Sequence, residues 1–186
     1  MITKQNVASR LLDDVSTAFK FNAADSEISQ KLILYEQTGE AIKYFDAHQD
    51  ELSDYAYWFF LSTLWVSYTG FSDLNVWKRL FSSRRPNKSI SIMKPSELKA
   101  LALMPKKLAA FRVHRKNETD WIAYTLSLET AKRFAAERGV THIDVYEIKK
   151  RDITGLFLRR GENEVILVDK KLARHINTLQ VKQGED

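Results

Sequence analysis

The amino-acid sequence predicts an α+β fold, in which a helical N-terminal half is followed by a small β-rich module with a mixed or antiparallel sheet. In the first half, apolar residues recur at helical spacing. From Leu108 onward, short runs of β-branched and aromatic residues replace that spacing. Helices first and strands afterwards are typical of α+β proteins rather than of repeating βαβ units. We therefore expect a helical region over residues 1–104 and a β-rich module over residues 105–186.

The helical region is predicted to contain several short helices joined by turns. Its apolar positions place helices at residues 7–19, 26–36, 41–47, from Asp50 or Ser53 to about Gly70, and about 74–81. Ser26 and Asp73 belong to the residue types that cap helix N-termini. Residues 82–95 form a basic, turn-rich linker that we expect to be an exposed loop. After it, Ser96 caps a short helix that Pro105 ends.

Aromatic residues are concentrated in this region. Ten of the 21 aromatic residues lie between Tyr55 and Phe81. Such a concentration builds either a surface on which bases stack or a helical core, and the helical spacing favours the core. The most apolar stretch, residues 55–68, is shorter than the ~20 residues that span a bilayer. We therefore interpret it as a buried helix and expect no membrane contact.

The β-rich module is predicted to contain five strands and one helix. The strands are expected at residues 108–114, 121–125, 141–148, 154–158 and 164–168. The helix covers Leu128–Arg138, because Ser127 is a suitable N-cap and Gly139 a suitable C-cap. No glycine-rich phosphate loop and no internal repeat occurs in the sequence.

The composition excludes several classes of chemistry. The 186 residues include no cysteine, so disulfides, thiolate metal sites and cysteine nucleophiles are excluded. The four histidines are dispersed without the spacing of metal ligands, and we expect no metal. The N-terminus lacks the apolar centre of a signal peptide. These features together suggest a cytoplasmic protein.

The net charge of +5 is unevenly distributed. Residues 1–54 carry five more Asp and Glu than Lys and Arg. Residues 55–104 and residues 105–186 each carry an excess of five Lys and Arg. A basic body suits an anionic cofactor, a nucleic acid or an acidic partner, and charge alone does not choose among them.

Two carboxylates stand at the start of the last predicted strand. On an extended chain, Glu162 and Glu164 project to the same side, at the edge of a buried core. Such a pair can divide acid–base and charge-stabilising roles when the two environments differ. The alternative is an exposed strand end whose glutamates pair with Arg159 and Arg160.

Two further groups of polar residues precede this pair. Arg112 and His114 share one face of a strand, where the guanidinium can bind a phosphate or carboxylate through two hydrogen bonds. The alternative is a pair of solvated charges on an edge strand. Thr125 and Ser127 stand at a strand-to-helix junction, where Ser127 can serve a site, cap the helix, or do both.

Taken in order, a strand arginine, a Thr/Ser pair before a helix, and a strand that opens with Glu162-Asn163-Glu164 resemble the mono-ADP-ribosyltransferases of the Arg–Ser–Glu class, including phage and bacterial members. The resemblance covers roughly residues 105–168. It implies an ADP-ribosyltransferase fold for the module and NAD as a substrate. It also implies modification of a host or bacterial protein, in the cytoplasm of a bacterium or of a phage-infected cell.

The resemblance also implies a role for each matched residue. Arg112, with His114 beside it, would contact NAD phosphate or ribose, and Thr125 or Ser127 would hold the nicotinamide pocket. Glu164 would be the catalytic carboxylate that stabilises the oxocarbenium-like transition state. Glu162 would orient an arginine acceptor.

Three functions therefore follow from the sequence. The first is an NAD-dependent mono-ADP-ribosyltransferase that modifies a protein, with arginine as the expected acceptor. The second is a catalytically inactive binding protein on the same fold, such as a phage factor that inhibits a host or defence protein. Val113 favours it, because the family usually has glycine after the strand arginine. The third, nucleic-acid binding through basic residues near the linker, is the least favoured; those residues are Arg79, Arg84, Arg85 and Lys88.

Overall fold

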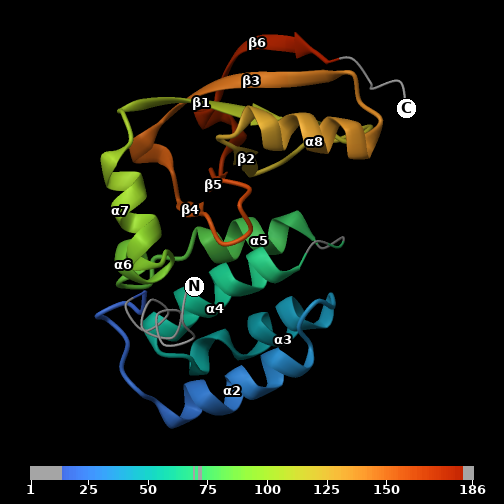
Figure 1. The fold of residues 1–186 in the computed structure, drawn as a ribbon. Coiled ribbons are helices and arrows are strands. Elements are labelled where there is room, and N and C mark those ends of the chain that lie inside the picture. Colours follow the sequence, from blue (N-terminus) through green and yellow to red (C-terminus); the bar gives the residue numbers. More distant parts are fainter. Residues whose placement is uncertain (1–13, 69, 71–72, 182–186) are drawn as a thin grey trace, which may run out of the picture. The chain divides into compact units, whose positions relative to one another are not determined.

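The computed structural model describes residues 14–68, 70 and 73–181 and has the α+β architecture that the sequence predicts. Its described part contains seven α-helices and one antiparallel sheet of six strands. The chain divides into two compact units, Met1–Ala100 and Leu101–Asp186, and the boundary falls inside one helix, Pro95–Leu103. Figure 1 shows the helices of the first unit and the sheet of the second.

The helices of the first unit are close to those expected. They are α2 (Ala23–Leu34), α3 (Glu40–His48), α4 (Asp54–Ser67), α5 (Leu74–Phe81), α6 (Lys88–Ser91) and α7 (Pro95–Leu103), with a 3₁₀ turn η1 (Gln49–Glu51) between α3 and α4. Ser53 and Asp73 cap α4 and α5 by accepting backbone N–H bonds, which confirms both predictions. The predicted helix at residues 7–19 lies mostly outside the described residues, and residues 14–20 form turns and extended chain.

Two predicted N-caps are wrong. α2 begins at Ala23 because the Asn22 side chain, rather than that of Ser26, accepts the N–H groups of Ala24 and Asp25. α7 begins at Pro95 instead of after Ser96. The carboxylate of Glu97 turns back and accepts the Lys94 N–H at 2.8 Å, which is the second half of a capping box, and Pro95 at the first helical position needs no N–H partner.

The aromatic residues of the first unit form its core, as their helical spacing predicts. Tyr57, Trp58 and Phe81 are fully buried, and Trp77 is nearly so. The polar ends of two of these rings are satisfied internally. Tyr57 Oη donates to Leu80 O at 2.9 Å, and Trp58 Nε1 donates to Pro86 O at 2.9 Å. No helix among the described residues has the length and apolar character needed to cross a membrane.

The segment 82–95 is only partly the exposed linker that the sequence predicts. It contains α6, and Ile92 is completely buried. The Arg85 guanidinium lies over the Tyr57 ring and donates to the carbonyls of Gln49 and Leu52, both at 2.8 Å. Lys88 Nζ lies over the Trp58 ring and donates to Phe81 O. These cations bind the protein itself, since long basic side chains can cover apolar rings while their heads meet backbone oxygens.

The second unit contains a sheet with the strand order β4-β5-β2-β1-β3-β6, in which every adjacent pair is antiparallel. The strands are β1 (Lys107–Arg112), β2 (Ala123–Thr125), β3 (His142–Lys149), β4 (Gly155–Phe157), β5 (Glu164–Ile166) and β6 (Arg174–Gln180). Helix α8 covers Leu128–Arg138 between the Ser127 N-cap and Gly139, which has a φ of 63°, as predicted. β6 was not predicted, because this edge strand is polar and mostly exposed.

Helix α8 packs on one face of this sheet (Figure 1). Ala131 and Ala135 of the helix meet Val113 and Ile143, and all four are buried. Small residues on α8 let the helix approach the strands closely, and the buried aliphatic side chains hold it there. The opposite face is aromatic, with Tyr124 and Tyr146 buried on β2 and β3.

The buried carboxylate of Asp25 gives a test of the first unit. It accepts the backbone N–H of Ser53 at 2.8 Å and the hydroxyl of Ser53 at 2.6 Å, so it ties α2 to the N-cap of α4. We expect Asp25→Ala to lower the free energy of unfolding by about 1–3 kcal/mol, because both donors lose a charged acceptor. Urea denaturation followed by tryptophan fluorescence measures this change.

Glu27→Ala is the matched control, because Glu27 is exposed on the same helix. It should change the free energy of unfolding by less than about 0.5 kcal/mol. Equal effects of the two substitutions would contradict this account of Asp25.

Candidate functional site

The strand register separates the predicted site residues into two groups on opposite faces of the sheet. Thr125 lies directly opposite Phe111 of β1 on one side and Glu164 of β5 on the other, so these three residues share a face. Phe111 packs against the α8 cluster, so this face is the one that α8 covers. Arg112 follows Phe111 in β1 and projects to the other face, because successive strand residues alternate.

Thr125 and Ser127 organise the junction between β2 and α8. Thr125 Oγ1 donates to Glu162 O at 2.5 Å and accepts the Ser127 N–H at 3.0 Å. Ser127 Oγ accepts the Thr130 N–H at 3.1 Å, which is the capping role expected for it. These bonds hold the end of β2 against the turn before β5, so Thr125, Ser127, Glu162 and Glu164 form one group, named here the junction group.

The two glutamates of the junction group do not occupy equivalent positions. β5 begins at Glu164, and Glu162 lies in the preceding turn, where Gly161 and Asn163 have φ values of 69° and 48°. The alternation expected for an extended chain therefore does not apply to Glu162. Left-handed residues on both sides of Glu162 instead fold the chain into a tight turn.

Glu162 is held by two guanidinium groups. Its carboxylate Oε1 lies 3.2 Å from Arg160 Nη2 and 3.7 Å from Arg133 Nη2, and its side chain is only 17% exposed. The alternative interpretation of the sequence, in which a strand-end glutamate pairs with a neighbouring arginine, therefore describes Glu162 well. Arg133 of α8 is a partner that the sequence pattern did not reveal, because the contact requires α8 to pack beside the β5 turn.

Arg112 and His114 belong to a second group on the other face. The Arg112 guanidinium donates to Ala123 O at 2.7 Å and to both carboxylate oxygens of Glu118, from Nη2 at 2.5 Å and from Nε at 3.2 Å. His114 Nδ1 lies 2.9 Å from Glu118 Oε2 and its Nε2 lies 3.0 Å from Tyr146 Oη. When Nδ1 carries the proton that binds Glu118, Nε2 accepts from the tyrosine. We call Arg112, His114, Glu118 and Tyr146 the Glu118 network.

The electrostatics of the Glu118 network favour an ionised carboxylate. Burial alone would raise the pKa of Glu118, but the His114 hydrogen bond and the charge and hydrogen bonds of Arg112 outweigh it and lower the pKa to about 2. Burial raises the pKa of Tyr146 to about 12, and that of Tyr124 as well, so both phenols remain protonated. Arg112 and Glu118 thus form a partly buried ion pair with bidentate geometry.

Glu118 and Tyr146 were not among the residues selected from the sequence. Glu118 follows His114 by four positions in a charged loop, and opposite charges at this spacing in a sequence can indicate a pair. Tyr146 is 32 residues from His114, so its contact depends on the β1–β3 register and has no local signature. The described residues contain no group of three or more His, Asp and Glu side chains arranged to hold a metal ion.

The junction group combines carboxylate and hydroxyl side chains with guanidinium groups beside it. Glu164 offers a carboxylate at the start of β5, opposite the hydroxyl-bearing Thr125. Arg133 and Arg160 bring two cations to the adjacent Glu162. Such a set can bind a sugar hydroxyl, stabilise developing positive charge on a ring, and attract a phosphate. The Glu118 network, by contrast, satisfies its own charges.

The low pKa of Glu118 predicts a pH dependence of stability. A carboxyl whose pKa is 4.5 when unfolded and about 2 when folded stabilises the native state above pH 4.5, and the stabilisation is lost as the pH falls toward 2. We expect wild type to lose up to about 2 kcal/mol between pH 7 and pH 3 relative to Glu118→Gln, which lacks the titrating group. Urea denaturation at pH 7, 5, 4 and 3 measures the difference.

Glu129→Gln is the control for this titration, because Glu129 lies on the surface of α8 with an 81% exposed side chain. Its unfolding curve should follow that of wild type at every pH. Parallel pH profiles for wild type and Glu118→Gln would contradict the assignment.

No protein-family model, no curated protein and no solved structure matches this chain. The resemblance to ADP-ribosyltransferase motifs therefore rests on the sequence alone. The structure brings together the junction group and places Arg112 and His114 in a separate network on the opposite face.

Proposed function

We propose that the second unit is an ADP-ribosyltransferase-like module that uses NAD as a substrate, with Glu164 as its central carboxylate. The observation that carries the proposal is the β2–β5 register, which sets Thr125 directly opposite Glu164. The hydrogen bonds of Thr125 then place Ser127 and the Glu162 turn beside the same strand ends. Residues matched to the Ser/Thr and Glu-x-Glu parts of the motif thus lie near one another, although they come from separate segments of the chain, whereas Arg112 lies on the opposite face.

The chemistry proposed for Glu164 follows from the bond that breaks. The bond between the nicotinamide nitrogen and ribose C1′ cleaves with its electron pair leaving on nicotinamide, and positive charge develops on the sugar ring. A fixed carboxylate beside the ring stabilises that charge, since it acts where water is partly excluded. A nucleophilic nitrogen of the acceptor protein then bonds to C1′ and releases its proton to solvent.

The surroundings of Glu162 support arginine as the acceptor. Glu162 already binds the guanidinium groups of Arg160 and Arg133, and an incoming arginine would make the same kind of contact. In this proposal Arg112 acts from the other face by fixing β2, because it donates to Ala123 O, next to Tyr124 and Thr125.

Substitution of Glu164 tests the proposal. We expect wild-type protein to release nicotinamide from NAD or to label an acceptor protein, and Glu164→Gln to reduce the rate at least about 100-fold, because the amide carries no charge to offset the cation. Chromatographic measurement of nicotinamide gives the rate. Glu129→Gln, on the exposed face of α8, should retain the wild-type rate.

A reaction that survives Glu164→Gln would refute the role of this carboxylate. Circular dichroism of the variant must match that of wild type, so that a loss of activity is not a loss of fold.

A second candidate function is a catalytically inactive module that binds a host or bacterial protein. The Arg112–Glu118 ion pair favours it, because a guanidinium already bound at both edges is not available to a phosphate. For this candidate we expect calorimetry to detect no NAD binding by folded wild-type protein. NAD binding that weakens in Glu164→Gln would contradict it and support the transferase.

A further inference from the structure

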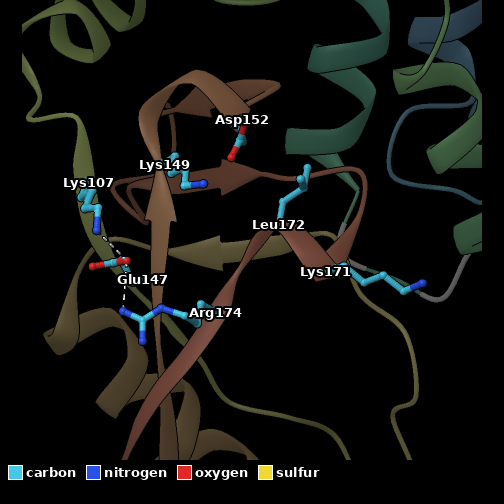
Figure 2. Close-up of a pocket in the computed structure, with 7 residues that line it drawn as sticks. All are labelled: Lys107, Glu147, Lys149, Asp152, Lys171, Leu172 and Arg174. Atoms are coloured by element: carbon cyan, nitrogen blue, oxygen red, sulfur yellow. Dashed lines mark hydrogen bonds and ion pairs between the residues drawn. The ribbon is translucent and has the colours of Figure 1, made fainter.

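A hollow lies in the same unit, away from the junction group. It has a volume of about 500 Å³, and its lining consists of four cations, two carboxylates and one leucine: Lys107, Lys149, Lys171, Arg174, Glu147, Asp152 and Leu172. Figure 2 shows these side chains. The hollow is at the Lys107 end of β1, whereas Thr125 of the junction group pairs at Phe111, about 13 Å farther along the strand.

The positive charge of the second half of the chain is concentrated around this hollow. Three short segments, residues 106–107, 147–152 and 169–174, contain eight Lys and Arg but three Asp and Glu, an excess of five. The whole stretch 105–186 has the same excess, so its remaining residues are neutral on balance. The register brings the three segments together, because Lys107 pairs with Lys149 and Glu147 pairs with Arg174.

The cross-strand pair of Lys107 and Lys149 is electrostatically unfavourable. The two lysines are directly opposite each other in the register and share one face of β1 and β3. Like charges in such a position destabilise a sheet. Among the described residues, Lys149 Nζ makes no hydrogen bond or ion pair, and its side chain points into the space beside Leu172 and Asp152 (Figure 2). An anion bound beside both lysine side chains would relieve this repulsion.

Glu147 neutralises only part of the positive charge of Lys107 and Arg174. Its Oε1 accepts from Lys107 Nζ at 3.2 Å and from Arg174 Nη2 at 3.1 Å, and these hydrogen bonds, that of Arg174 first, lower the pKa of Glu147. One carboxylate thus holds two cations whose side chains are 64% and 68% exposed. Glu147 orients both cationic groups toward one point and leaves most of their donors to solvent.

The other lysines nearby make different contacts or point elsewhere, so they are not assigned to the ligand. Lys150 Nζ donates to the carbonyls of Ala102 and Met104 at the end of α7. Lys170 Nζ lies over the Trp121 ring. Lys171 extends away from Glu147 in Figure 2. Of the cations that line the hollow, Lys107 and Arg174 meet at Glu147, and Lys149 points toward Leu172 (Figure 2).

We propose that this hollow binds a phosphorylated small molecule, with its phosphate between Lys107, Lys149 and Arg174. Three cationic side chains in the lining suit the charge of a phosphate group, and the arginine fork suits its oxygens. The exposed Leu172 offers an apolar contact to the rest of the ligand. Glu147 and Asp152 in the lining repel an extended polyanion, and the volume fits a small molecule. The site is independent of Glu164 and of the proposed NAD chemistry.

Calorimetric titration of the full chain with pyrophosphate tests the proposal. Wild-type protein should bind, and Lys149→Gln and Arg174→Gln should each weaken the affinity about tenfold or more, since each removes a charged donor. Glu147→Gln should tighten binding several-fold, because it removes the carboxylate that competes for two of the cations. Lys132→Gln, an exposed control on α8, should bind within about twofold of wild type.

Three outcomes would overturn the proposal. The first is an absence of pyrophosphate binding at millimolar concentration, and the second is equal affinities for Lys149→Gln and Lys132→Gln. The third is tighter binding of a hexaglutamate peptide than of pyrophosphate, which would assign the hollow to acidic proteins. Glu164→Gln should leave pyrophosphate affinity unchanged, so failure here is distinct from failure of the transferase proposal. Thermal melting checks that each variant is folded.

Discussion

The pairing of β1 with β3 is the constraint on which the second unit depends. Six consecutive residue pairs, from Lys107 with Lys149 to Arg112 with Asp144, define one register. A shift by a single residue would reverse the face of every β1 side chain. Phe111 would leave the face that α8 covers, and Tyr146 would lose His114. Each face of the sheet is covered by a different set of side chains, and the burial of either face requires this same register.

This register divides the polar chemistry of the unit between the two faces of the sheet. Glu164 lies on the α8 face at one end, and the pair of Lys107 and Lys149 lies on that face at the other end of β1. Arg112 lies on the aromatic face and meets Glu118. Arg112 and Glu164, which belong to one motif in the sequence, therefore lie in separate groups of residues. The sheet separates these two groups.

Local features of the fold could be predicted from the sequence, and features that depend on distant partners could not. Helix α8 was predicted to the residue, because Ser127 and Gly139 specify its ends within the segment itself. Asn22 was overlooked as a cap because Ser26 is equally suitable in type, and only the geometry distinguishes them. Strand β6 escaped prediction because its pattern is polar, and its pairing with β3 defines it. The residues of the junction group could be selected from the sequence. The turn at Glu162 and the contact of Glu162 with Arg133 could not be predicted.

The irregular pairing of β6 has a consequence for the sheet as a whole. β6 is one of the two edge strands, and its pairing with β3 steps from Asn177 to His175, which leaves Ile176 as an extra, bulged residue. The other edge, β4, is only three residues long. A bulge and charged or polar side chains make β6 a poor template for pairing with another chain. β4 is a poor template because it is short. Neither border of the sheet offers a long, flat row of backbone groups to a second chain, so the architecture resists growth by strand addition.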